Sequence, residues 1–191
     1  MLPLLFLFIL LPASKGQAII GGSFAQSGEF PFAVNIWANE PEDNYVAHLC
    51  GGSLISAKWV LTAAHCVLED ATETQKRVIS ASKLSLYVGG IQHSGGDGRA
   101  VKAKSIQVHP DFVWPRNDFA LIELAEPVTD IQPVGLNGLN LSQSTEAVTV
   151  VGWGLTDSDG KNESDTLKKL SAPLLPIEPV SYTHLTLPTK A

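Results

Sequence analysis

The segment from Trp59 to Cys66 reads W-V-L-T-A-A-H-C, and the rest of the chain is interpreted from it. Its first four residues are aromatic, apolar or β-branched and favour a buried strand, while Ala63 and Ala64 are small enough for a tight turn. We therefore expect His65 at the end of a rigid element. Cys66 follows at once and Cys50 lies upstream, so a disulfide between them would pin the strands on either side of the histidine.

A lone histidine is more often a structural residue than a catalytic one, so His65 needs support from its surroundings. The segments 49–54 and 59–66 together resemble the histidine motif of the chymotrypsin/trypsin-like serine proteases. The resemblance implies that His65 is a general base that accepts the proton of a serine hydroxyl. It also implies an all-β fold of two antiparallel β-barrels, with the active site in the cleft between them.

The composition is that of a globular protein, and the first residues indicate export. Of the 191 residues, 45% are hydrophobic and the formal net charge is −6, which argues against a nucleic-acid partner. Residues 1–11 are almost wholly apolar but too short to span a bilayer, and Pro12 and small residues follow. We predict a signal peptide over residues 1–18, or over 1–16 with a dipeptide pro-segment. The protein is then secreted and has no membrane contact after signal removal.

The segment 19–22, Ile-Ile-Gly-Gly, resembles the mature amino terminus of the same family. The resemblance implies that a freed α-ammonium at Ile19 folds inward and pairs with an aspartate beside the nucleophile. Ala18 precedes it, whereas relatives activated by trypsin carry Lys or Arg there. Two routes stay open: signal peptidase cuts after Ala18, or it cuts after Gly16 and the remaining dipeptide is then removed.

Short segments with strand-like patterns recur along the chain and no amphipathic helix of useful length separates them, which favours an all-β barrel. They cover residues 32–37, 48–55, 59–62, 84–88 and 101–108. Asp118 precedes the apolar run 119–122, and such an aspartate is commonly just a turn residue. In this order after the histidine motif it resembles the triad aspartate of the family. The resemblance implies that Asp118 accepts a hydrogen bond from Nδ1 of His65.

We predict no metal and no cofactor. Some relatives bind calcium through several carboxylates in a loop near residues 89–98, and Asp97 alone cannot do so. The same loop lacks the glycine patterns that hold phosphates. Asn140 and Asn162 each begin an Asn-x-Ser sequence in a polar segment, which makes them candidate glycosylation sites.

We divide the mature chain into an N-terminal barrel over residues 19–135 and a partial C-terminal barrel over residues 136–178. The Gly-Asp-Ser-Gly-Gly motif that carries the nucleophile of the family does not occur in the sequence. We therefore expect a fragment that lacks the catalytic serine and is inactive alone. Residues 180–189 resemble an in-frame translation of a sequencing-library adapter, and we interpret residues 179–191 as an artefactual tail.

Two functions follow from these residues. The first is a secreted serine endopeptidase that acts on proteins or peptides and has protein protease inhibitors as further partners. The second is a secreted non-catalytic homologue that acts as a binding or regulatory protein. The presence of both His65 and Asp118 favours the first, because a binding module has no chemical need for that pair.

Overall fold

The computed structural model of the chain describes residues 22–40, 45–69, 77–136, 147–154 and 163–173. Several predictions concern residues outside these ranges: the signal peptide over 1–18, the amino terminus at Ile19, the glycosylation candidates Asn140 and Asn162, and the tail over 179–191. The division of the chain at residue 135 stays a prediction as well.

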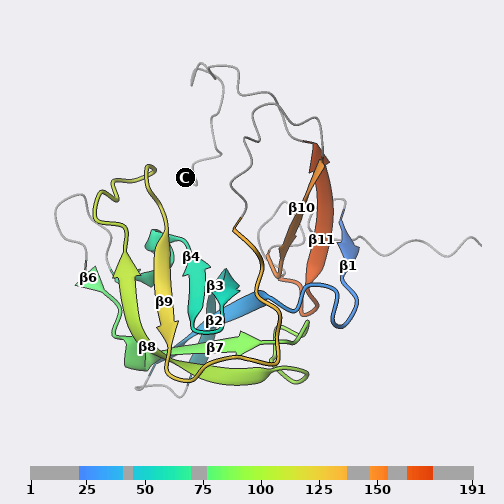
Figure 1. Cartoon of the computed structure of the whole chain (residues 1–191), viewed down its shortest axis with the longest axis horizontal. Coiled ribbons are helices and arrows are strands. Elements are labelled where there is room, and N and C mark those ends of the chain that lie inside the picture. The colour runs from blue at the N-terminus through green and yellow to red at the C-terminus, as the bar shows by residue number, and fades with distance from the viewer. Residues whose placement is uncertain (1–21, 41–44, 70–76, 137–146, 155–162, 174–191) are drawn as a thin grey trace, which may run out of the picture.

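Six antiparallel strands close into a barrel (Figure 1). Around the barrel their order is β2-β3-β4-β9-β8-β7, so each strand has a hydrogen-bonded neighbour on both sides. Their bounds are β2 Ala33–Glu40, β3 Tyr45–Ser56, β4 Trp59–Thr62, β7 Leu84–Val88, β8 Arg99–Val108 and β9 Ala120–Leu124. The predicted all-β fold is confirmed, and strands β4 and β7 have the bounds that the sequence predicts.

Alternation of apolar and polar side chains builds the core of the barrel. In β9, Ala120, Ile122 and Leu124 are buried while the residues between them are partly exposed. Ile122 lies opposite Val60 of β4, and neither side chain is exposed to solvent. Burying one such side chain stabilises a fold by about 1.5–3 kcal/mol, so the closed barrel is a firm support for residues at the ends of its strands.

Short elements connect the barrel strands. The 3₁₀ turn η1, Ala64–Val67, follows β4 directly, and η2, Ala81–Lys83, precedes β7. Strands β5, Leu68–Glu69, and β6, Arg77–Val78, form a small antiparallel ribbon beside them. No helix in the described part of the chain has the length and apolar content needed to cross a membrane.

A second, open sheet of three antiparallel strands lies beside the barrel (Figure 1). Its order is β1-β11-β10, with bounds β1 Ser23–Phe24, β10 Ala147–Gly152 and β11 Lys168–Pro173. Its small buried cluster consists of Ala25, Ala33, Trp153 and Leu167. Strands β10 and β11 lie within residues 136–178, which the sequence assigns to a partial second barrel, and β1 from the beginning of the described chain joins them.

The loop of residues 89–98 joins the barrel to this sheet. The carbonyl of Ile91 accepts hydrogen bonds from Trp153 Nε1 at 2.8 Å and from the amide of Leu167 at 2.7 Å. The amide of His93 donates to the carbonyl of Asp165. Asp97 shapes the loop from inside, because its two carboxylate oxygens accept the amides of Ile91 and Gln92, each at 2.9 Å.

Candidate active site

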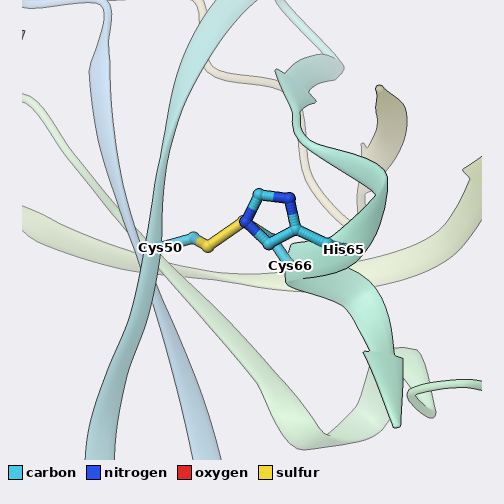
Figure 2. A group of neighbouring side chains, drawn as sticks. All are labelled: Cys50, His65 and Cys66. Carbon is cyan, nitrogen blue, oxygen red and sulfur yellow. A yellow bond between two sulfur atoms is a disulfide. The ribbon is translucent and has the colours of Figure 1, made fainter. Parts of the chain in front are cut away.

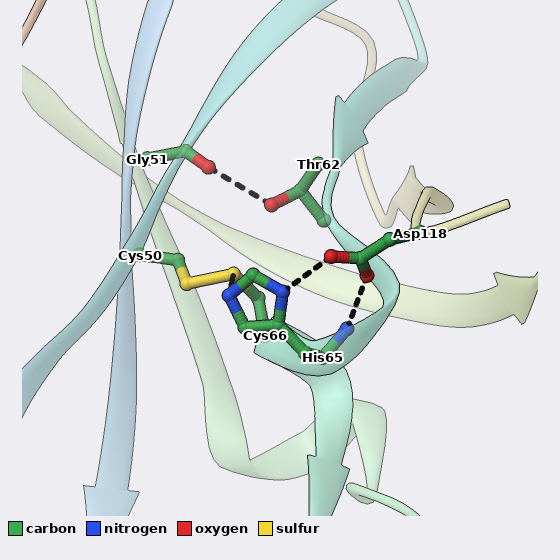
Figure 3. Close-up of a disulfide and its surroundings, with 6 residues drawn as sticks. All are labelled: Cys50, Gly51, Thr62, His65, Cys66 and Asp118. Carbon is green, nitrogen blue, oxygen red and sulfur yellow. Dashed lines mark hydrogen bonds and ion pairs between the residues drawn. A yellow bond between two sulfur atoms is a disulfide. The ribbon is translucent and has the colours of Figure 1, made fainter. Parts of the chain in front are cut away.

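His65 lies where strand β4 ends. The strand pairs with β3 on one side and β9 on the other, and the Thr62 hydroxyl donates to the carbonyl of Gly51 at 2.8 Å (Figure 3). The predicted tight turn is a single 3₁₀ turn that begins at Ala64, whose side chain is fully buried. Small side chains at the turn therefore let the chain reverse against the barrel while His65 points outward.

The predicted disulfide between Cys50 and Cys66 is present (Figure 3). Cys50 lies in β3 and Cys66 in the turn η1, with their Cα atoms 6.0 Å apart. Together with the bond from Thr62 to Gly51, the disulfide fixes the turn that carries His65 against β3. The histidine thus has less freedom than a residue in an ordinary surface loop.

Strand pairing brings Asp118 to His65 although 53 positions separate them. Asp118 comes just before β9, and the ladder between β4 and β9 places Thr62 opposite Ala120. Asn117 adopts a left-handed backbone conformation with φ of 55°, which asparagine tolerates better than most residues. Its side-chain amide nitrogen Nδ2 donates a hydrogen bond to the backbone carbonyl of Asp111 at 2.9 Å. The backbone just before Asp118 is therefore held in place as well.

Both carboxylate oxygens of Asp118 bind the same histidine (Figure 3). Oδ2 lies 2.7 Å from Nδ1 of the His65 ring, and Oδ1 accepts the backbone amide of His65 at 2.9 Å. A carboxylate only accepts hydrogen bonds, so the proton of a neutral ring lies on Nδ1. Nε2 then carries the free lone pair.

The electrostatics keep Asp118 ionised. Burial raises the pKa of its carboxyl group, but hydrogen bonds from the backbone and ring of His65 outweigh this effect and hold the pKa below its ordinary value. The carboxylate is therefore negative at neutral pH and stabilises a positive charge that forms on the imidazole ring.

The open side of His65 faces solvent. Its side chain is 48% exposed, whereas that of Asp118 is 19% exposed. The ring of Trp114 meets the histidine ring edge-on, with 5.5 Å between the ring centroids. No sequence pattern singles out Trp114, because it lies in a loop whose course depends on tertiary structure; its position four residues ahead of Asp118 is the only signal.

A pocket of about 350 Å³ separates the barrel from the open sheet. Its walls come from Ala33, residues 51–53 and Leu61 on the barrel side and from residues 151–153 on the sheet side. Gly51 follows Cys50 directly, so the pocket begins next to the disulfide that holds the turn of His65. Space for a further segment or a ligand is therefore available between the barrel and the open sheet.

One group of three possible metal ligands occurs within the described ranges: Cys50, His65 and Cys66, whose ligand atoms lie within 4.8 Å of one another (Figure 2). While the two cysteines are joined as a disulfide they offer no thiolate, which is the form that binds metals. Asp97, the residue considered for calcium, uses both carboxylate oxygens on backbone amides of its own loop.

Comparisons with known proteins identify related sequences. A family model described as Trypsin matches residues 19–184. Mouse tryptase is 35% identical over 153 residues, which are 77% of this chain and 52% of the relative. Serine protease SP24D of Anopheles gambiae is 36% identical over 75% of this chain and 49% of the relative. Trypsin 5G1 of Aedes aegypti is 35% identical over 85% of this chain and 56% of the relative. The chain spans about half the length of these relatives.

Proposed function

The chain belongs to the trypsin family, and from this premise we propose that the full-length protein is a secreted serine endopeptidase. It hydrolyses peptide bonds of proteins or peptides by a Ser-His-Asp mechanism. His65 is the general base and Asp118 the residue that positions it. Secretion after removal of residues 1–18, an activating amino terminus at Ile19 and glycosylation at Asn140 and Asn162 belong to the same proposal.

One observation carries the proposal: the carboxylate of Asp118 accepts hydrogen bonds from the ring and the backbone of His65, which leaves the proton-accepting lone pair on Nε2, 3.5 Å from Sγ of Cys66, in a ring that is 48% exposed. A serine hydroxyl that reaches Nε2 loses its proton to the ring as its oxygen attacks the peptide carbonyl carbon. Asp118 stabilises the resulting imidazolium. The ring then returns the proton to the leaving amine, so the same atom acts first as base and then as acid.

The nucleophile is the further part that this mechanism requires. The 191 residues contain no Gly-Asp-Ser-Gly-Gly sequence, so we propose that the full-length protein supplies the serine from another segment. The pocket beside Gly51, between barrel and open sheet, is the space in which such a segment and a substrate would approach His65. These 191 residues alone are then inactive.

A fluorophosphonate probe on the full-length, activated protein tests the proposal, because it labels only a serine that a neighbouring base activates. We expect labelling of one serine in the wild type. His65→Ala should slow it on the order of 10²- to 10⁴-fold, the usual contribution of a general base. Asp118→Asn should also slow it, since the ring loses the carboxylate that fixes its tautomer.

Asp111→Asn is the matched control, because Asp111 is an exposed aspartate in the same loop and its hydrogen bonds to His109 and Asn117 run through its backbone. It should label at the wild-type rate. Absence of serine labelling in the activated wild type would overturn the proposal and favour the non-catalytic homologue, a binding or regulatory protein built on the same barrel.

A further inference from the structure

We propose that reduction of the Cys50–Cys66 disulfide creates a zinc site in which the two cysteine sulfurs and Nε2 of His65 bind one Zn²⁺ ion. The three side chains come from two separate elements, strand β3 and the turn η1, and they converge on one point (Figure 2). Two thiolates and one imidazole are ligands that zinc prefers, with a fourth position left for water.

The distance between the histidine and the nearer sulfur already suits the metal. Nε2 of His65 lies 3.5 Å from Sγ of Cys66. A tetrahedral zinc ion with Zn–S of about 2.3 Å and Zn–N of about 2.0–2.1 Å holds its sulfur and nitrogen ligands about 3.5 Å apart. The two sulfurs have to separate, and Sγ of Cys50, which lies within 4.8 Å of the other two ligand atoms, has to settle at a similar distance from Nε2. The Cα atoms of the cysteines are 6.0 Å apart, so side-chain rotation can provide this movement.

Asp118 completes the arrangement from the other side of the ring. A histidine that binds zinc almost always donates its second ring N–H to a carboxylate or carbonyl, which orients the ring and makes the metal-binding nitrogen more basic. Here Nδ1 of His65 lies 2.7 Å from Oδ2 of Asp118, and Nε2 faces the sulfurs. The exposed face of His65 gives the ion a path from solvent.

The chemical step needs a reductant, for which we name a small dithiol. One of its thiolates attacks a disulfide sulfur, and the other cysteine leaves as a thiolate. The second thiol of the reductant then displaces the first cysteine, so the protein gains two electrons and the dithiol becomes a cyclic disulfide. Zinc binds the two cysteines as thiolates, and any protons they carried are released to solvent.

The consequence for activity rests on the proposed function. Zinc would occupy Nε2 of His65, which is the atom that must take the proton from the serine. Reduction together with zinc would therefore switch off the enzyme, whereas the oxidised protein would be insensitive to zinc at this site. Binding of the metal itself does not require a nucleophile.

Cobalt(II) titration of the full chain tests the site directly, because tetrahedral cobalt–thiolate complexes absorb in the near-ultraviolet and visible ranges. The protein is first reduced with dithiothreitol, and the dithiothreitol is then removed under anaerobic conditions. The reduced protein is titrated with Co²⁺ and afterwards with Zn²⁺. We expect the near-ultraviolet and the visible absorption bands of bound cobalt in the reduced chain, and we expect zinc to abolish them by displacing the cobalt. The oxidised chain and the double variant Cys50→Ser/Cys66→Ser should show neither band.

Two substitutions separate the three-ligand site from a pair of thiols. His65→Ala should weaken cobalt binding at least 10-fold, and Asp118→Asn should weaken it about 10- to 100-fold, the usual effect of losing the carboxylate behind a ligating histidine. His109→Ala is the matched control and should bind like the wild type. Unchanged affinity in His65→Ala, or absence of bands in the reduced wild type, would overturn the proposal.

A measurement in urea distinguishes cobalt binding by the folded protein from cobalt binding by an unfolded chain. The reduced wild type should bind cobalt at least 10-fold more weakly in concentrated urea, since unfolding separates β3 from η1. Equal affinity with and without urea would overturn the proposal, because the folded arrangement would then contribute nothing. Fluorophosphonate labelling of the full-length protein reports on the nucleophile and the cobalt spectrum does not, so failure of one proposal is distinguishable from failure of the other.

Discussion

The closed barrel and the open sheet β1-β11-β10 consist of similar strands but bury their side chains to different extents. Every barrel strand has neighbours on both sides, and its inward residues such as Val34 and Leu54 are fully buried. In the open sheet β10 pairs with β11 alone among the described strands, and Val150 is 49% exposed. His65 and Asp118 are both attached to the barrel, so the closed region holds the hydrogen-bonded pair of the proposed active site.

The largest expected effect comes from truncating a buried leucine in each region. Leu86 of β7 and Leu167, just before β11, are both fully buried. Leu86→Ala should lower the free energy of unfolding of the barrel by about 2–5 kcal/mol, because it leaves a cavity in the main core. Leu167→Ala should instead loosen the open sheet and leave the barrel almost unchanged. Amide hydrogen exchange of Ile122 and of Lys169 reports on the two regions separately.

Independent unfolding of the barrel and the open sheet is contradicted if Leu167→Ala accelerates exchange of the Ile122 amide as much as Leu86→Ala does. The two regions would then unfold as one cooperative unit. The hydrogen bonds that Ile91 makes to Trp153 and Leu167 would be strong enough to couple them.

Substitution of two glycines tests the next largest effect, at the loop of residues 89–98 that joins the barrel to the open sheet. Gly95 and Gly28 both have a left-handed backbone, with φ of +77° and +76°. A Cβ at Gly95 would lie 2.3 Å from the Tyr87 ring, while a Cβ at Gly28 meets nothing within 4 Å. Gly95→Ala should therefore destabilise the protein by about 1–3 kcal/mol more than Gly28→Ala, since only the overpacking differs between them. Urea unfolding measures both.

A weak effect of Gly95→Ala would mean that the Tyr87 ring moves aside easily. The ring packs against Trp37 with 5.5 Å between centroids, so we expect resistance. In Gly95→Ala the amides of His93 and Leu167, which bond across the junction, should also exchange faster than in Gly28→Ala.

How much of this was predictable differs between the same two regions. Strand-like patterns predict five of the six barrel strands, all except β9, and the resemblance of the histidine and aspartate motifs to those of the family implies the pairing of His65 with Asp118. The strand β1 is not predictable, because two residues have no period and its partner β11 is far away in sequence. The contact between Trp114 and His65 also depends on a loop that has no repeating pattern.

Acid should weaken the anchoring of His65 before it weakens the barrel core. The pKa of Asp118 lies below its ordinary value of 3.8 in the folded protein. The carboxylate therefore stabilises the fold fully above about pH 4, and this contribution is lost as the pH falls through the lowered pKa. We expect Asp118→Asn to remove on the order of 1 kcal/mol at neutral pH, as for a partly exposed charge-assisted hydrogen bond.

Thermal unfolding from pH 7 down to pH 2 distinguishes this contribution from general acid effects. The wild-type and Asp118→Asn curves should converge at low pH, whereas Asp111→Asn should follow the wild type throughout. Parallel curves for the wild type and Asp118→Asn would show that the carboxylate adds nothing to stability in its charged form.

The smallest effect should be a gain in stability within the open sheet. Lys168 is only 2% exposed, burial lowers its pKa from 10.5, and among the described residues it contacts the Phe24 ring but forms no ion pair. Lys168→Met should therefore stabilise the sheet by about 1 kcal/mol at neutral pH. The gain should shrink as the pH rises through the lowered folded-state pKa and disappear above about 10.5, where the lysine is neutral in both states. Lys169→Met, which loses an ion pair with Glu29, should give no gain. A loss of stability in Lys168→Met would instead indicate that the buried ammonium has an anionic partner outside the described residues.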